Sequence, residues 1–318
     1  MQNLNFNELS RLFLEDYIHQ VQPSTFKKVD RLFNNHFIPD FNQRLVSSIS
    51  LQEMQQYVYR LNTMFVRYKK HYCYLKRCFN FAEKRNYITF NPCTNISLPK
   101  ELKMPPKRKL FLEVHELQAF LSACLHDPRP YIHVFFRLLA VSGIRRQEII
   151  ALTWDCVNFT EGYIDVNKAI SYNLDDEEVL STTKNAASSR IITIDSKTLD
   201  FLCEWKALQL EQFKANHIKS LPSHRQYIFT KKNKNVHVSL SAPYQWIEQI
   251  CSRSNLPHLS PHIFRHTHCS ILIEQQSNIK EVQHRMGHAD INTTLKYYTH
   301  VLNKKSDLGD KLAHYIDD

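Results

Sequence analysis

The sequence predicts a mostly α-helical protein with a small antiparallel β-sheet, organised as a helical domain followed by an α+β domain. Three observations lead to this prediction. A chain of 318 residues exceeds what one hydrophobic core usually serves. Apolar residues recur at helical spacing over most of the chain, whereas short strand-like runs cluster between Gly162 and Ile194. A basic stretch with three prolines, at residues 97–110, separates the two parts.

The first part, residues 1–96, is predicted to be entirely helical. An apolar face of Leu9, Leu12, Phe13 and Tyr17 indicates a first helix. Ser24 is expected to cap a second helix. Ser50 and Glu53 form a capping-box pattern ahead of a third. A long fourth helix is predicted from a seam of apolar residues at steps of three and four: Phe65, Tyr68, Tyr72, Leu75, Phe79 and Ala82.

Positive charge is concentrated in this first part. Residues 1–110 hold 18 Lys and Arg against 8 Asp and Glu, whereas residues 111–318 hold 23 of each. A concentrated basic excess attracts polyanions. We therefore expect double-stranded DNA as a partner, although a solvated lysine-rich surface is the simpler alternative. The candidate DNA-binding residues are Lys27, Lys28, Arg31, Lys69, Lys70, Lys76 and Arg77, with Lys107 and Arg108 in the linker.

The second part, residues 111–302, is predicted to contain both helices and strands. Helices are expected over 113–125 and 129–141, with a stop at Gly143 and a new helix near Arg145. Strands are expected over 163–166, 179–182 and 190–194, with Arg190 as a surface charge. Five further helices are expected over 197–215, 241–253, 262–275, 278–286 and 291–301. A short tail, 303–318, completes the predicted organisation.

Composition excludes several classes of protein. Only four glycines occur, so neither a P-loop nor a GxGxxG dinucleotide fingerprint is present. No apolar run is long enough for a membrane span, and acidic residues in the first apolar helix exclude a signal peptide. The eight cysteines form no CxxC pair. Reduced thiols and a cytoplasmic location are therefore expected.

Three islands in the second part contain residues suited to phosphate chemistry. Arg145 opens a helix immediately after Gly143, where the backbone already favours an anion; pairing with Glu148 across one turn is the alternative. His262 and Arg265 lie three residues apart, on one helix face. His288 follows Gly287, and Tyr297 and Tyr298 follow about ten residues later. Two arginines, two histidines and a tyrosine can therefore meet at one site.

These islands resemble those of the tyrosine recombinases, the phage-integrase family. Gly143-Ile144-Arg145-Arg146-Gln147-Glu148 matches the family's first arginine box, and His262 to Arg265 matches its His-x-x-Arg box. The ten-residue step from His288 matches Tyr298 to the nucleophile, and Lys184 matches a lysine on a hairpin turn. The resemblance spans residues 5–302, and the basic helical part is similar to the family's core-binding domain. No arm-binding domain is expected ahead of it.

The resemblance implies a metal- and ATP-independent enzyme that cuts and rejoins DNA through a 3′-phosphotyrosyl intermediate and a Holliday junction. The expected catalytic residues are Arg145, Lys184, His262, Arg265, His288 and Tyr298. Arginines would stabilise charge on the phosphate oxygens, His262 would accept the tyrosine proton, and Lys184 would protonate the leaving oxygen. His288 would donate to a phosphate oxygen. No metal site and no cofactor are expected.

The implied partners are DNA attachment or core sites and three further copies of the chain in a homotetramer on DNA. The tail 303–318 would serve protomer contacts, and an excisionase or a host DNA-bending factor is a further possible partner. No membrane association is expected. The Arg265-His266-Thr267-His268 stretch favours an integrase or excisionase of a mobile genetic element. The alternative within the family is a chromosome-dimer resolvase.

Two interpretations outside this function remain open at this point. A metal-dependent hydrolase is suggested by His258, His262 and His266, which repeat every four residues, although Pro261 interrupts that helix and Arg265 would place a cation beside the metal. A catalytically inactive DNA-binding regulator on the same fold is the second. All six active-site positions are filled, which argues against inactivity.

Overall fold

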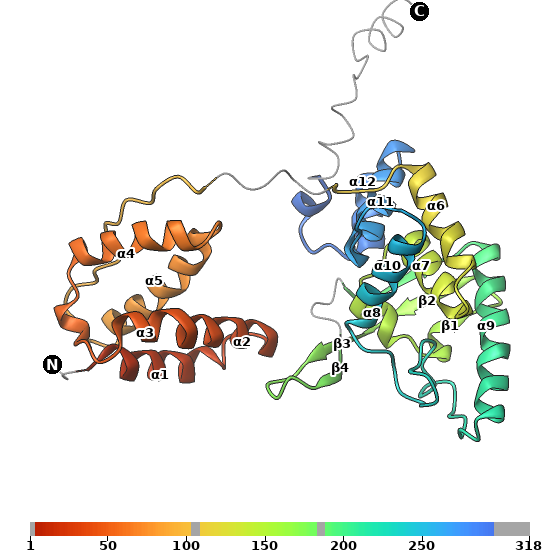
Figure 1. The fold of residues 1–318 in the computed structure, drawn as a ribbon, viewed down its shortest axis with the longest axis horizontal. Helices are drawn as coiled ribbons and strands as arrows, with labels where there is room; N and C mark the ends of the chain where they lie inside the picture. Colours follow the sequence, from red (N-terminus) through yellow and green to blue (C-terminus); the bar gives the residue numbers. More distant parts are fainter. Residues whose placement is uncertain (1–3, 103–108, 183–187, 296–318) are drawn as a thin grey trace, which may run out of the picture. The chain divides into compact units, whose positions relative to one another are not determined.

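A computed structural model describes residues 4–102, 109–182 and 188–295 (Figure 1). The chain divides into two compact units, the first formed by Met1–Lys107 with Tyr172–Glu177 and the second by Arg108–Ser171 with Glu178–Asp318. Lys184 and Tyr298, the linker residues Lys107 and Arg108, and the expected tail 303–318 lie outside the described residues.

The first unit is an all-helical bundle around an aromatic core. It contains α1 (Phe6–Tyr17), α2 (Pro23–Leu32), η1 (Phe33–Phe37), α3 (Ile38–Phe41), η2 (Val46–Ser48), α4 (Leu51–Met64) and α5 (Tyr68–Lys84). Phe6 contacts both Phe41 and Phe79, with ring centroids 4.9 and 5.9 Å apart. Aromatic side chains remove much apolar surface from water per residue, so they can hold together a bundle of short helices.

The ends of these helices test the predictions directly. The Ser50–Glu53 capping box is confirmed at the start of α4. The expected cap at Ser24 is wrong: Gln22 is the cap residue of α2, and Pro23 is its first residue. Proline has no N–H and a fixed φ, so it favours the first helical position, and the helix starts two residues earlier than a Ser24 cap would require. The long helix predicted from Phe65 onward is α5, which begins only at Tyr68. Phe65 lies outside it, in an extended conformation with φ −132° directly after the end of α4 at Met64. The remaining seam, from Tyr68 to Ala82, is buried in α5 as predicted.

The second unit combines helices with two small sheets. Its helices are α6 (Val114–Leu125), α7 (Pro130–Ser142), α8 (Arg146–Ala151), η3 (Trp154–Cys156), α9 (Ser196–Ala215), α10 (Ala242–Arg253), α11 (Pro261–Glu274) and α12 (Ile279–Met286). Its strands are β1 (Val157–Asn158), β2 (Tyr163–Val166), β3 (Lys168–Tyr172), β4 (Glu178–Thr182) and β5 (Arg190–Thr193). Residues 291–295 are also helical.

Strand pairing separates the two sheets. β2 lies between β1 and β5 and pairs antiparallel with both, while β3 and β4 form a two-stranded sheet. The three predicted strands are therefore present. β1 and β3 were not predicted; β1 has only two residues, too few for the alternation of polar and apolar side chains that reveals a strand.

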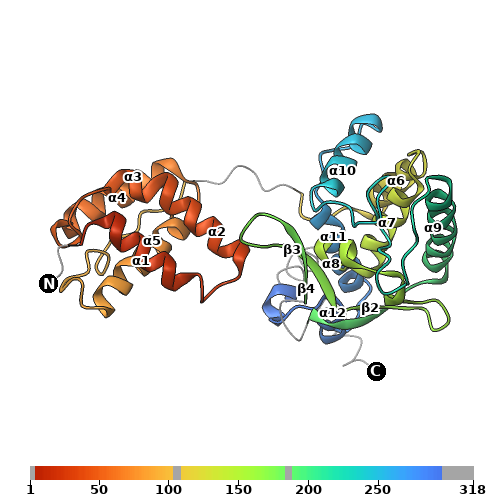
Figure 2. The same cartoon turned by 90° about the horizontal axis from the view of Figure 1, so that it is seen from below.

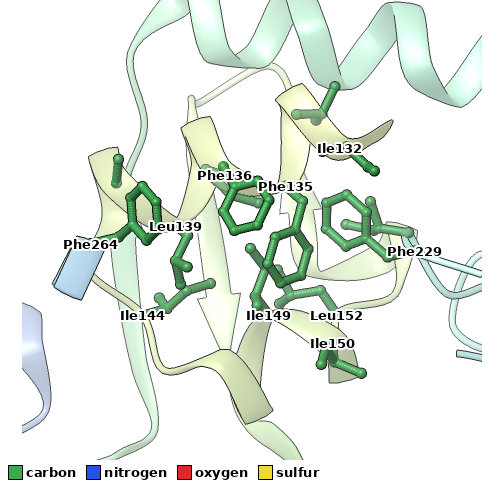
Figure 3. Close-up of a cluster of buried hydrophobic side chains, with 14 of the residues drawn as sticks. Ile132, Phe135, Phe136, Leu139, Ile144, Ile149, Ile150, Leu152, Phe229 and Phe264 are labelled. Carbon is green, nitrogen blue, oxygen red and sulfur yellow. The ribbon is translucent and has the colours of Figure 1, made fainter. Parts of the chain in front are cut away.

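Helix α7 forms the centre of the second unit and positions the site. It packs against α6, α8, α9 and α11 (Figure 1, Figure 2). Figure 3 shows Phe135 and Phe136 of α7 beside Ile149 of α8, with Phe229 and Phe264 completing the cluster. The predicted stop is confirmed, because Gly143 ends α7 in the left-handed conformation with φ 64°. The chain then turns directly into α8.

No helix within the described parts of the chain is long and apolar enough to cross a membrane. All eight cysteines are free thiols.

Candidate active site

Gly143 is required at the turn between α7 and α8 for two reasons. Its positive φ is rarely adopted by other residues. A Cβ atom at this position would also lie 2.5 Å from Cδ2 of His268, inside van der Waals contact. Only glycine therefore lets α11 approach this turn, and the next residues place Arg145 at the start of α8.

Arg145 is held in place from two sides. Its Nη1 donates to Oε1 of Glu148 at 2.7 Å, and its Nη2 donates to the carbonyl oxygen of Gly287 at 2.7 Å. Both the helix-turn pairing and the predicted position at the helix start are thus present. The side chain stays 32% exposed, so the guanidinium is accessible to a ligand. Arg146, its neighbour, points elsewhere: it donates to the carbonyl of Leu240 and lies over the ring of Tyr244.

Arg265 reaches the same helix end from α11. Its side chain is buried, and it donates to the carbonyl oxygens of Gly143 and Met286. Arg145 and Arg265 therefore bind consecutive carbonyls, those of Gly287 and Met286, at the C-terminus of α12. The last carbonyls of a helix lack intrahelical partners and form the negative end of its dipole, so they attract cations. This helix end brings together two arginines that lie 120 residues apart in the sequence.

His288 follows directly from this helix end. Its Nδ1 lies 2.9 Å from Oγ1 of Thr294, a fully buried side chain. Burial, with the positive charges of Arg265, Arg145 and Arg190, lowers the pKa of His288 to about 3. The ring is therefore neutral near pH 7. In the tautomer in which Thr294 donates to Nδ1, Nε2 carries the proton and can donate to a ligand.

His262 occupies the first turn of α11, on the exposed side of that helix. Its ring packs edge-on against His266, with centroids 4.4 Å apart. Partial burial, together with Arg265, Arg145 and Arg146, lowers its pKa. A neutral imidazole surrounded by arginines can accept a proton but binds it weakly.

The predicted metal alternative receives no support from the geometry. His258 precedes α11, so it does not share a helix face with His262 and His266. Within residues 4–102, 109–182 and 188–295, no three His, Cys, Asp or Glu side chains are grouped so that they could hold a metal ion.

Sequence reasoning misplaced Arg190. It is a buried residue, not a surface charge, and its Nη2 lies 3.0 Å from Oε2 of Glu148. The strand pattern held a signal for this position, because Arg190 and the buried Ile192 lie two residues apart and therefore on one face of β5. The prediction relied on the charge of arginine and placed Arg190 at the surface, whereas the alternation of side chains along β5 indicated correctly that it is buried.

Buried His268 and half-buried Arg285 form a second pair of side chains that links α11 to α12. Nδ1 of His268 lies 2.9 Å from the carbonyl of Ala140, and its Nε2 accepts from Nε of Arg285 at 3.2 Å. These contacts give His268 a role in packing α11 against α7. Arg285 also donates to the carbonyl of Thr193, which ties α12 to β5.

The basic residues predicted to bind DNA lie on two helices of the first unit. Lys28 and Arg31 of α2 are exposed, while Lys27 is half-buried. On α5, Lys69 and Lys70 are exposed. Lys76 follows Lys69 by seven residues, and Arg77 follows Lys70 by seven. A seven-residue step returns to nearly the same helix face. These four residues therefore form two parallel basic rows: Lys70 and Arg77 lie opposite the buried seam, and Lys69 and Lys76 lie to one side of it.

The arrangement brings Arg145, Arg265 and His288 together at the C-terminus of α12, within an α+β unit that follows a helical one in the sequence. Comparison of the chain with models of known protein families identifies its family. Residues 110–305 match the family model "Phage integrase family", and residues 5–62 match "Phage integrase, N-terminal SAM-like domain". The chain belongs to the phage integrase family, and it is a tyrosine-type site-specific recombinase. The predicted family, fold class and enzyme class are confirmed.

One similar sequence and two similar structures show which members of the family this chain resembles. It is 27% identical over 314 residues to the ICEBs1 integrase of Bacillus subtilis (strain 168), covering 98% of this chain and 83% of that protein. Its fold matches the Tn1549 transposon integrase in complex with a circular intermediate DNA, with a TM-score of 0.78, 20% identity and coverage of 97% and 98%. It also matches a lambda integrase tetramer bound to a Holliday junction, with a TM-score of 0.65, 14% identity and coverage of 93% and 78%.

Proposed function

We propose that this chain is the integrase of a mobile genetic element, the recombinase that both inserts the element and excises it. The observation that carries the proposal is the convergence of Arg145, Arg265 and His288 at the C-terminus of α12. Similarity to the ICEBs1 integrase over nearly the whole chain supports a mobile element, rather than a chromosome-dimer resolvase, as the setting.

The cleavage step follows from the chemistry of the site. The Tyr298 hydroxyl attacks the scissile phosphate, forming a 3′-phosphotyrosyl bond and releasing a 5′ oxygen. Arg145 and Arg265 stabilise the negative charge that develops on the nonbridging oxygens. His262 takes the proton from Tyr298, His288 donates to a phosphate oxygen, and Lys184 protonates the leaving oxygen. The phosphotyrosyl bond conserves the energy needed for rejoining, so neither ATP nor a metal ion is needed.

Recombination requires two duplexes, and we propose four copies of the chain on them. The lambda integrase tetramer on a Holliday junction supports this assembly. The DNA backbone would be contacted by the basic rows of α5, by the basic residues of α2, and by Lys107 and Arg108 of the linker. Recombination would take place in the cytoplasm. The tail 303–318 would make protomer contacts, and an excisionase or a host DNA-bending factor would set direction.

Capture of the covalent intermediate tests this function. The substrate is a nicked suicide duplex built on the direct repeat that flanks the element, and adducts are resolved by denaturing electrophoresis with excess chelator present. The wild type and Tyr297→Phe should form an adduct, and Tyr298→Phe should form none. DNA cleavage that occurs without an adduct and is lost in chelator would favour the metal-dependent alternative. Bound DNA that is neither cleaved nor joined to the protein would favour the inactive regulator.

A further inference from the structure

Arg190 is a buried cation with three acceptors on three different segments. Its Nη2 donates to Oε2 of Glu148 at 3.0 Å, its Nε to the carbonyl of Arg285 at 2.7 Å, and its Nη1 to the carbonyl of Ser188 at 2.7 Å. Its side chain is fully buried, and that of Glu148 is 3% exposed. A charge without contact to solvent cannot be binding DNA directly, so its role must be exerted through its neighbours.

Two of these acceptors lead to residues of the site. Glu148 is the carboxylate that holds Arg145, through the guanidinium at 2.7 Å and the backbone N–H at 2.8 Å. Arg285 immediately precedes Met286 and Gly287, whose carbonyls bind Arg265 and Arg145. One side chain on β5 thus fixes the carboxylate behind Arg145 and the helix end that Arg145, Arg265 and His288 share.

The ionisation of Glu148 depends on this arrangement. Burial opposes ionisation, but the charges of Arg190 and Arg145, the two cations that face the carboxylate, outweigh it and lower the pKa of Glu148. A guanidinium presents donors in a planar fork, so it can reach acceptors in three directions at once. A lysine ammonium at the same position is a point charge on a flexible stem and would keep only part of this network.

We propose that Arg190 is a positioning residue for DNA cleavage, which presets Arg145 and the end of α12 before DNA binds. This inference rests on the proposed function. In the absence of Arg190, the Glu148 carboxylate would lose one of its two cations and the α12 carbonyls would lose a donor. Arg145 would then be free to move, and a displacement of about 1 Å at a reacting group can cost about 10²-fold in rate.

The test compares single-turnover cleavage and DNA affinity, using the full chain and the suicide duplex described above. Arg190→Met should lower the cleavage rate about 10²-fold. Arg190→Lys should lower it about tenfold, because one compact ammonium cannot reach all three acceptors of the guanidinium. Affinity for the uncleaved duplex should stay within about threefold of the wild type, since Arg190 is buried. The acid limb of the pH–rate profile should move to higher pH in Arg190→Met, because Glu148 ionises less readily beside Arg145 alone.

Arg137→Met is the matched structural control. Arg137 also bridges elements of the second unit, donating to Thr198 and Asp195 at the start of α9, both at 2.9 Å. The Arg137→Met variant should have lower thermal stability, but the cleavage rate of the folded variant should stay within about twofold of the wild type. Combining Arg190→Met with Glu148→Gln should slow cleavage by less than the product of the two single effects, because the two residues share one contact.

The outcomes separate the inference from the function beneath it. If the wild type forms no Tyr298-dependent adduct, the proposed function fails. If the wild type forms the adduct and both Arg190 variants cleave at its rate, the inference alone is overturned. If Arg190→Met does not fold, Arg190→Lys decides: reduced cleavage with unchanged affinity supports positioning, and wild-type cleavage refutes it.

Discussion

Arg145 and Arg265 donate to consecutive carbonyl oxygens, those of Gly287 and Met286, at the C-terminus of α12. The two arginines come from different helices, and no local pattern relates them. Their common partner is a helix end, whose unpaired carbonyls attract cations whether or not a substrate is bound. The two guanidinium groups are thus held in place before any ligand binds, which is the condition under which the proposed phosphate donors would contribute most to catalysis.

The first prediction separates Arg145 from its neighbour. Arg145→Lys should lower the single-turnover cleavage rate about 10²–10³-fold, as expected when one fixed donor to a developing oxyanion is removed. Arg146→Lys should have a much smaller effect, because Arg146 contacts Leu240 and Tyr244 instead of the helix end. Quench-flow measurement of adduct formation checks both variants. An equal loss in the two would contradict the assignment of Arg145.

The second prediction concerns the turn at Gly143. Gly143→Ala should destabilise the protein by more than about 1–3 kcal/mol, since strain from the positive φ adds to a clash with His268. Gly162→Ala is the matched control: its φ is also positive, at 69°, but the nearest atom to a new Cβ lies 3.5 Å away. Urea denaturation of both variants measures the difference. Equal destabilisation would show that space at His268 is not limiting.

The Gly143 turn also shows which features of the structure can be predicted from the sequence. The helix stop, the start of α8 and the capping box at Ser50 were all predictable, because each depends on residues within one turn of each other. The family and its site motifs were recognisable for the same reason. Ser24 failed as a cap because Pro23 competes for the helix start, a choice between two local signals.

What the sequence did not reveal depends on contacts between distant segments. Arg190 was assigned to the surface because an isolated arginine usually lies there, and its partner Glu148 is 42 residues away. The bracing of His268 by Arg285 and the shared carbonyls of α12 are also products of packing. Periodicity on β5 was the available clue, since Arg190 shares a face with Ile192.

The third prediction is a dependence of stability on pH. Burial, with the charge of Arg285 nearby, lowers the pKa of His268 to about 4, against an unfolded value of about 6.5. The unfolded chain therefore takes up a proton that the folded one refuses. Stability should be unaffected by this group above about pH 6.5 and should fall between about pH 6.5 and 4, by about 1.4 kcal/mol per pH unit for one such histidine.

Chemical denaturation across this pH range, with a His268 variant, measures that contribution. His268→Gln keeps a donor and an acceptor but does not titrate, so its stability should fall less steeply on acidification. His284→Gln, at an exposed position of α12, is the control and should follow the wild type. An unchanged slope in His268→Gln would mean that other groups govern the acid sensitivity.

The fourth prediction concerns the basic rows of α5. Lys69 and Lys76 lie on one helix face, so replacing both with glutamine should remove up to two phosphate contacts. The slope of log K against log salt should become shallower by about 0.9 for each phosphate that is no longer neutralised. Lys214→Gln, an exposed position on α9, serves as the control. Fluorescence anisotropy at several salt concentrations gives the slopes, and identical slopes would remove these lysines from the DNA interface.

The central claim is that this chain cuts DNA by becoming bonded to it through Tyr298. Nuclease digestion of the trapped adduct, followed by tandem mass spectrometry, identifies the residue that carries the nucleotide remnant. The account predicts a remnant joined to Tyr298 through a 3′ phosphate. A remnant on Tyr297 or on any other residue, or a 5′ linkage, would contradict it.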